Sequence, residues 1–223
     1  MNKQNSANGL ALTSAYLFIM ICQLMIPHYF RNGPAYLICT LIWLLGASAM
    51  IFLNRRFSFK NPVDSTEKCT QATHEAILIG LGLIATLAAQ ILLTTFEVNV
   101  LHQPSGSENT NMFIEIIHQY PYYFLCPVIA APITEELVFR KFFFGNFSSV
   151  LPKLICALIS STVFSIGHSD GHFIVYAAIG LILCYVYEKS GKIRTSMIVH
   201  MLMNLTVMLI NLCLLYTSDA ADE

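Results

Sequence analysis

Several side chains of this 223-residue chain could do chemistry, and they occur in stretches that are otherwise apolar. They are Glu135, Glu136, Arg140, His168, His200 and Asn204. Ionisable residues are costly inside a membrane, so those within spanning segments are candidates for function. A carboxylate beside a histidine can deprotonate a water molecule, and a second histidine with an amide can stabilise an oxyanion. The set therefore suffices to hydrolyse an amide bond without a covalent intermediate.

The two adjacent glutamates are expected to play different parts. On a helix Glu136 and Arg140 are four residues apart with the acid first, an order that favours an ion pair. Glu135 lies about 100° around the helix axis, so it cannot easily share this partner and is left as the candidate general base. An alternative is that Pro132 and Thr134 begin a helix here, with both acids complementing its N-terminal dipole.

The histidines and the asparagine lie on other apolar windows. His168 ends one of them, where a lone histidine could also lie at the membrane interface. His172 follows after residues that favour a turn, so we expect it in a loop or at the interface. His200 and Asn204 project from one helix face, which indicates a polar cavity more than a helix contact. With Glu135, these side chains come from three spans and predict a buried polar site in a bundle.

The elements that must position these residues are predicted to be membrane-spanning helices. About 20 apolar residues are needed to cross a hydrocarbon layer of about 30 Å. The qualifying windows are about 10–27, 35–53, 75–95, 117–147, 152–168, 172–188 and 195–216. The composition agrees, because 56% of residues are apolar and only 11% are charged, against roughly 25% charged residues in soluble domains. We therefore predict an all-α, polytopic integral membrane protein with about seven spans.

Charge and cysteine patterns constrain the environment and the partners. Basic residues cluster after the second and sixth windows, at Arg55, Arg56, Lys60, Lys68, Lys189, Lys192 and Arg194. The connection 97–112 has none, so the positive-inside rule places it outside and the N-terminus in the cytoplasm. A net charge of −1 excludes a nucleic-acid partner. The seven cysteines contain no C-x-x-C pair and are interpreted as apolar side chains.

The ordered motifs E-E-x-x-x-R, F-x-x-x-H and H-x-x-x-N resemble those of the CAAX prenyl protease and bacteriocin-processing (CPBP) intramembrane proteases. The phenylalanine of the second motif is Phe164. The motifs cover about residues 134–204, whereas the first 110 residues carry no family signature. On this basis we divide the chain into N-terminal transmembrane helices (1–112) and a protease-like core (113–212). Residues 213–223 resemble a translated sequencing adapter and are assigned as a non-native tail.

The resemblance implies an endopeptidase, and it gives each motif residue a role. Glu135 with His168 would activate water, and His200 with Asn204 would stabilise the tetrahedral intermediate. Glu136 and Arg140 would hold the motif helix in place, with Phe164 as further structural support. No cofactor is required in this interpretation. The alternative is a metalloprotease with Zn²⁺ held by Glu135, His168 and His200.

Known members of the family suggest the substrate class and the location. Eukaryotic members remove the last three residues of prenylated C-a-a-X proteins, whereas bacterial members are linked to bacteriocin maturation or self-immunity. This short chain resembles the bacterial group, which implies a peptide or membrane-associated protein substrate at the bacterial plasma membrane. The alternative from another class is a non-catalytic immunity factor, or a peptide-binding or transport protein, whose polar cluster binds without hydrolysing.

Helix geometry raises one conflict with this interpretation. If the fifth span starts near Pro152 on the cytoplasmic side, a helix rise of about 1.5 Å per residue places His168 about 24 Å away. His200 would instead lie near the inner face. A shared site therefore requires a span that is tilted, interrupted or set deeper.

The chain lacks the residues that other classes of intramembrane protease require. His74 and Glu75 begin an H-E-x-x-H zinc motif, but Leu78 stands where the second histidine is needed. The aspartates lie outside the predicted spans, which excludes an intramembrane aspartyl protease. The phenylalanines at 142–144 and 147 are interpreted as an interfacial belt or lipid-facing surface.

Overall fold

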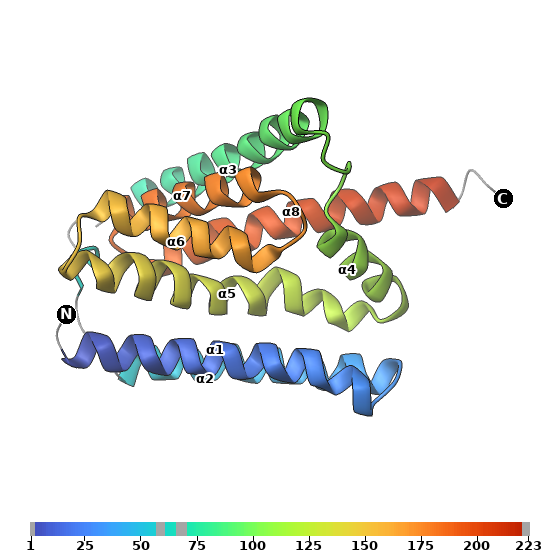
Figure 1. The fold of residues 1–223 in the computed structure, drawn as a ribbon, viewed down its shortest axis with the longest axis horizontal. Coiled ribbons are helices and arrows are strands. Elements are labelled where there is room, and N and C mark those ends of the chain that lie inside the picture. The colour runs from blue at the N-terminus through green and yellow to red at the C-terminus, as the bar shows by residue number, and fades with distance from the viewer. Residues whose placement is uncertain (1–2, 57–60, 66–70, 220–223) are drawn as a thin grey trace.

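The computed structural model describes residues 3–56, 61–65 and 71–219, and this part of the chain contains helices but no strands. The longer helices are α1 (Lys3–Tyr29), α2 (Gly33–Arg56), α3 (Ala72–Leu101), α4 (Glu108–Gln119), α6 (Lys153–His168), α7 (Phe173–Ser190) and α8 (Ile193–Asp219). Between α4 and α6 runs a helical segment, Pro121–Ser149, that includes α5 (Ala131–Glu135). Figure 1 shows the bundle these helices form. The predicted all-α polytopic architecture is confirmed.

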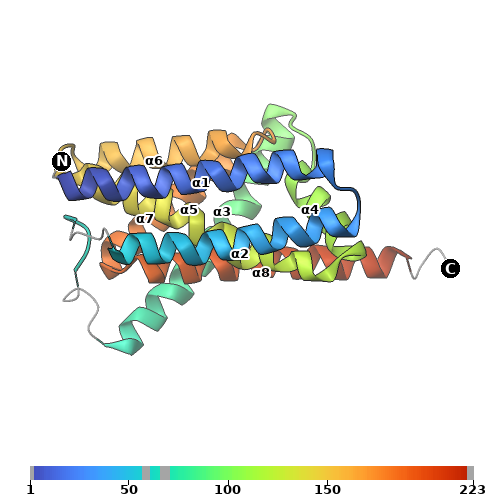
Figure 2. The same ribbon diagram turned by 90° about the horizontal axis from the view of Figure 1, so that it is seen from below.

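Six of the described helical segments are long and apolar enough to cross a membrane. They are Asn5–Tyr29, Gly33–Arg56, Ala72–Leu101, Pro121–Ser149, Phe173–Ser190 and Ile193–Leu215. The remaining predicted window, 152–168, corresponds to α6, which has only 16 residues and is therefore about 24 Å long. Consecutive segments run in opposite directions (Figures 1 and 2). The chain thus makes seven passes along the bundle, one of them short.

Ion pairs connect the helix ends that meet at the N-terminal end of the bundle. Glu75, in the first turn of α3, pairs with Lys192 at 2.9 Å and with Arg194 at 2.8 Å at the start of α8. Lys153 at the start of α6 pairs with Glu188 near the end of α7 at 2.8 Å. These contacts place the basic connection after α7 beside the beginning of α3. The predicted basic residues at 60 and 68, and the cysteine at 69, lie outside the described residues.

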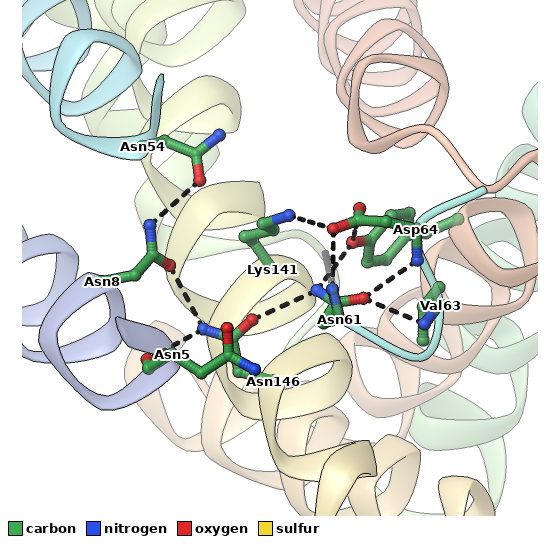
Figure 3. Close-up of polar contacts among 9 residues, drawn as sticks. Asn5, Asn8, Asn54, Asn61, Val63, Asp64, Lys141 and Asn146 are labelled. Atoms are coloured by element: carbon green, nitrogen blue, oxygen red, sulfur yellow. Dashed lines mark hydrogen bonds and ion pairs between the residues drawn. The ribbon is translucent and has the colours of Figure 1, made fainter. Parts of the chain in front are cut away.

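A short segment of the α2–α3 connection, residues 61–65, closes this end of the bundle (Figure 3). The buried Asn61 amide donates to Asn146 Oδ1 at 3.1 Å and to the Tyr187 hydroxyl at 3.2 Å. Asp64 forms an ion pair with the buried Lys141 and accepts a hydrogen bond of 2.6 Å from Tyr187. The buried lysine is thereby neutralised, which a charge removed from water requires.

Asn146 extends this network to the first two helices (Figure 3). Its Nδ2 donates to Asn8 Oδ1 on α1 at 3.2 Å, and Asn8 in turn donates to Asn54 Oδ1 on α2 at 3.2 Å. Gly145 leaves room for the contact, because a Cβ atom there would lie 2.5 Å from Asn61 Nδ2. The asparagines thus attach α1 and α2 to the segment that carries the motif glutamates.

Two boundaries differ from the sequence-based prediction. The external connection 97–112 was predicted to begin at Glu97, but α3 continues to Leu101, and Glu97 is buried within it. The apolar residues that follow it extend the helix, and contacts described below compensate its charge. The helix α4 was missed because it is amphipathic, and its start is defined by Ser107, whose hydroxyl accepts the backbone N–H of Thr110 at 3.2 Å.

The phenylalanines at 142–144 and 147 were predicted to face lipid or the interface, and this prediction is wrong for part of the cluster. Phe144 is buried and packs against Tyr187, with ring centroids 6.1 Å apart. Phe142 and Phe147 pack edge to face at 4.9 Å and are half-buried. The reason is that this segment lies between α1 and α6, where both faces of the helix have neighbours.

The assigned tail, residues 213–223, begins inside α8, which continues to Asp219. Residues 220–223 lie outside the described residues. Every cysteine that the structure describes is a free thiol, as the spacing predicted.

Candidate active site

The predicted site residues gather around a cavity of about 410 Å³ within the bundle. Glu135, His168 and Asn204 line it, and Tyr16 of α1 and Trp43 of α2 contribute to its wall. The first two helices, which carry no motif residue, therefore help to enclose the site. Three different segments supply the candidate catalytic side chains, as the sequence predicted for a buried polar site.

Both motif glutamates contact the same imidazole, that of His200 on α8. Glu136 Oε1 lies 3.1 Å from His200 Nδ1, and Glu135 Oε2 lies 3.7 Å from His200 Nε2. A carboxylate at Nδ1 favours the tautomer with the proton on that nitrogen, which leaves Nε2 to face Glu135. Glu136 therefore orients the histidine in addition to holding its own helix, a contact that sequence reasoning did not anticipate.

The expected ion pair between Glu136 and Arg140 is present in the bundle interior. Glu136 Oε1 lies 3.0 Å from Arg140 Nη1, and both side chains are 0% exposed. The guanidinium also lies 4.2 Å from the centroid of the Phe164 ring, a distance at which a cation is attracted to the ring face. Glu135 has no comparable cation on its own helix, and it is 14% exposed at the cavity. The two carboxylates thus occupy different electrostatic environments.

The backbone around the glutamates is not a regular α-helix. Glu135 ends α5, and Glu136 begins a π-helical segment, Glu136–Asn146, that carries Arg140. A second π-helical stretch, Cys126–Ala130, precedes α5. π-Helical turns widen a helix and often occur at functional sites.

Asn204 donates a hydrogen bond to the backbone oxygen of Pro127, which has no partner within its own helix. In the π-helical register Ala131 N–H bonds to Cys126 O, so the next carbonyl, of Pro127, would need the N–H of Pro132. Proline has no N–H group. Asn204 Nδ2 donates to Pro127 O at 2.8 Å and satisfies it. The second N–H of the amide remains available at the cavity.

Phe164 connects the two motif histidines. Its ring packs edge to face with His168 at 4.6 Å and with His200 at 5.8 Å between centroids. Figure 1 shows that α6 and α7 turn back well before the far end of α8, so the turn that carries His168 lies within the length of the bundle. The Phe164 ring, one helical turn before His168, is therefore the side chain through which the two histidines are connected despite the length of α6.

The geometry brings some of the predicted partners together and leaves others apart. Among the described residues Glu135 is ion-paired with His200 but not with His168. The pairing of Glu135 with His168 for water activation stays a prediction. The described histidines, cysteines and acids include no group of three or more at metal-binding spacing. Glu135, His168 and His200 therefore do not form such a group in this arrangement.

Comparison with known proteins agrees with the motif geometry. The family described as type II CAAX prenyl endopeptidase Rce1-like matches residues 117–206. The UPF0177 protein YxdF of Lactococcus lactis is 32% identical over 126 residues, which are 54% of this chain and 68% of that protein. The membrane-embedded CAAX protease MroQ of Staphylococcus aureus is 25% identical over 207 residues, 88% of this chain and 74% of that protein. The chain belongs to the CPBP family of intramembrane proteases.

The matches of this CPBP protein cover different shares of its relatives. YdiL of Bacillus subtilis is 30% identical over 132 residues, and this match spans about half (54%) of that protein. No solved structure gives a significant match to the chain. The matched range 117–206 contains every motif residue and begins before the π-helical segments.

A polar network of this CPBP protein, beside the site, was missed by sequence reasoning. His172 was predicted in a loop or at the interface, and it does precede α7, but it is buried. Its Nδ1 lies 2.8 Å from Glu97 Oε2, and the other oxygen of Glu97 accepts the backbone N–H of Ile174 at 2.7 Å. The sequence contained a signal for Glu97 only: this acidic residue is followed by further apolar residues, which is compatible with a position inside the helix.

The pair of Glu97 and His172 should make part of the folding stability depend on pH. His172 lies in the turn between α6 and α7. Burial by itself lowers the pKa of His172. The hydrogen bonds to Glu97 and to the Gly106 carbonyl raise it, as do the negative charges of Asp170 and Glu97. These contributions exceed the effect of burial, so the pKa of His172 is raised. A raised pKa gives a stabilisation that is complete below the unfolded value of about 6.5 and is lost as pH rises through the folded value.

We therefore expect the Tm of the purified protein in detergent to fall more steeply above about pH 6.5 for the wild type than for Glu97→Gln. Glutamine retains an acceptor for Ile174 but removes the negative charge. Thermal unfolding of both proteins across this pH range measures the difference. Parallel curves would contradict the assignment of the raised pKa to this pair.

Proposed function

We propose that the chain is an intramembrane endopeptidase that hydrolyses a peptide bond with a water molecule activated by glutamate and histidine. The observation that supports this most is the placement of Glu135 beside His200, whose other ring nitrogen is held by Glu136. This arrangement stands at a cavity that His168 and Asn204 also line. Membership of a protease family supplies independent support.

In the proposed mechanism Glu135 accepts a proton from a water molecule, and the water oxygen bonds to the carbonyl carbon of the substrate. The oxyanion that forms accepts a hydrogen bond from the free N–H of Asn204, and a second one from His200 Nε2 when this nitrogen carries a proton in addition to the one on Nδ1. Collapse of the intermediate breaks the C–N bond, and the proton held at Glu135 passes to the leaving amine. Glu136 and Arg140 keep His200 and the motif helix in register throughout.

His168 is proposed to assist the water. Its Nδ1 lies 2.9 Å from the backbone oxygen of Phe164, so that nitrogen carries the proton. The lone pair of neutral His168 is then on Nε2, at the cavity that Glu135 also lines. A water molecule between the two side chains could be oriented by both, as the family resemblance implies.

The proposed substrate is a peptide or a small membrane-associated protein, and the proposed location is the bacterial plasma membrane with the N-terminus in the cytoplasm. The bacterial sources of the relatives support the location, and the basic residues at the N-terminal end of the bundle support the orientation. CAAX-type processing is suggested by the name of the Staphylococcus aureus relative, and bacteriocin maturation or self-immunity by the bacterial members of the family.

The test uses purified protein in lipid vesicles with a farnesylated C-a-a-X peptide, the same peptide without farnesyl, and a set of leader-containing bacteriocin precursors. Mass spectrometry identifies any new termini. Cleavage is expected to persist after treatment with a strong zinc chelator, because the proposed mechanism needs no metal. Loss of cleavage that added Zn²⁺ restores would contradict the metal-free mechanism. Binding of these peptides without cleavage would support the non-catalytic alternative.

A further inference from the structure

We propose that Tyr176 is a positioning residue for His168, and that Asp170 holds Tyr176 in place through its hydroxyl group. The inference rests on the proposed function, because it assigns a task to His168 at the cavity. It concerns a different set of contacts, those that His168 makes with α7 and with the turn before it.

The imidazole of His168 is confined between two aromatic rings. Tyr176 stacks on it with centroids 3.9 Å apart and planes inclined by 23°. Phe164 packs against it edge to face at 4.6 Å. Because Nδ1 is bonded to the backbone oxygen of Phe164, the remaining freedom of the ring is a tilt, which the stacked tyrosine opposes. Tyr176 thereby fixes where Nε2 points.

Tyr176 is itself held by charged and polar neighbours. Its hydroxyl donates to Asp170 Oδ2 at 2.8 Å and lies 3.3 Å from the Ser107 hydroxyl. Ser107 also donates to Asp170 Oδ2 at 2.5 Å. A hydrogen bond to a carboxylate is stronger than one between neutral groups, so the ring is anchored at its far end.

The backbone that carries His168 is also fixed. His168 is the last residue of α6, and Ser169 after it has a positive φ of 50°, so the final carbonyls lack helical partners. Asn109 of α4 donates to the His168 carbonyl at 2.7 Å. The α3–α4 connection and α4 therefore supply the groups that hold both the tyrosine and the histidine. This gives the amphipathic α4 a reason to lie against the site.

The experiment compares Tyr176→Leu and Tyr176→Phe in the peptide-cleavage assay, using whichever peptide the wild type cleaves. Tyr176→Leu removes the stacking ring and is expected to lower kcat about 10- to 100-fold, by analogy with the loss seen when a group that orients a metal-bound histidine is removed. KM should change less than about twofold, because uniform substrate binding is not affected. Tyr176→Phe retains the ring and should recover most of kcat. Tyr185→Leu, on an exposed tyrosine of the same helix, is the matched control and should behave as wild type.

A readout that does not need turnover is the titration of His168 by NMR on protein with labelled histidine. The expected result is a shifted and broadened His168 signal in Tyr176→Leu, with a smaller effect in both Tyr176→Phe and Asp170→Asn, which keep the stacking ring but weaken its anchor. Thermal unfolding establishes that each variant is folded. If Tyr176→Leu does not fold, the comparison of Tyr176→Phe with Asp170→Asn still tests the anchoring hydroxyl.

Unchanged kcat, pH profile and His168 signal in a folded Tyr176→Leu protein would overturn the inference. So would equal losses in Tyr176→Leu and Tyr176→Phe, since the stacking ring would then not matter. Failure of the proposed function looks different, because the wild type would then bind the peptides without cleaving them. The His168 signal in the Tyr176 variants still tests the inference in that case, so the two hypotheses are separated by different measurements.

Discussion

Replacing Glu135 by glutamine is expected to lower the rate of peptide cleavage about 10²- to 10⁴-fold, the range that general-base catalysis supplies. Glutamine keeps the shape and the hydrogen-bonding capacity of the side chain but cannot accept a proton from water. Glu135 lies 3.7 Å from His200 and takes no part in the fully buried ion pair of Glu136 with Arg140, so the stability of the fold should be unaffected. Initial rates of peptide cleavage and the Tm of the same preparation measure the two effects.

Glu115→Gln is the matched control, because Glu115 is an exposed acid on α4 that lies outside the cavity lining. It makes the same chemical change and should leave the rate unchanged. Full activity in folded Glu135→Gln would eliminate the proposed mechanism and would move the role of base to another group. A parallel loss in Glu115→Gln would show that the assay responds to charge in general.

Replacing Arg140 by alanine is expected to destabilise the fold by about 3–5 kcal/mol, the cost of leaving one member of a buried ion pair without its partner. Glu136 and Arg140 are both 0% exposed, and Arg140 also packs over Phe164. Removal of the guanidinium therefore leaves a buried carboxylate and an unfilled space above the ring. Denaturant titration in detergent measures the loss of unfolding free energy.

The double variant Glu136→Gln with Arg140→Met tests the physical reason. It removes both charges and keeps most of the side-chain volume, so stability should return to within about 1–2 kcal/mol of the wild type. Activity should remain low, because Glu136 no longer orients His200 through a carboxylate. An Arg140→Ala protein as stable as its parent would contradict the assignment of a structural role to Glu136 and a catalytic role to Glu135.

The sequence allowed the fold class and the ion pair of Glu136 with Arg140 to be predicted. Long apolar windows indicate helices in a membrane regardless of how they pack, because a backbone in lipid must satisfy its own hydrogen bonds. The spacing of Glu136 and Arg140 predicted their ion pair, since side chains four apart on a helix are neighbours. The same reasoning failed at Glu97, where charge alone was taken to mark the end of a span.

Contacts between segments distant in sequence could not be predicted in this way. Nothing local to Glu136 shows that it also meets His200, 64 residues later, and nothing local to Asn204 shows that it caps the Pro127 carbonyl. The stacking of Tyr176 on His168 likewise depends on how α6 and α7 turn. Such contacts arise from the relative depth and rotation of helices.

The sequence by itself thus determined the class of protein and its helical architecture, and it indicated the chemical types of the candidate site residues, since these follow from hydropathy and short-range spacing. Only the tertiary structure decided which carboxylate touches which nitrogen, how deep α6 reaches and what holds His168. The physical reason is that helix periodicity fixes which face a side chain is on, whereas packing of whole helices decides what that face meets.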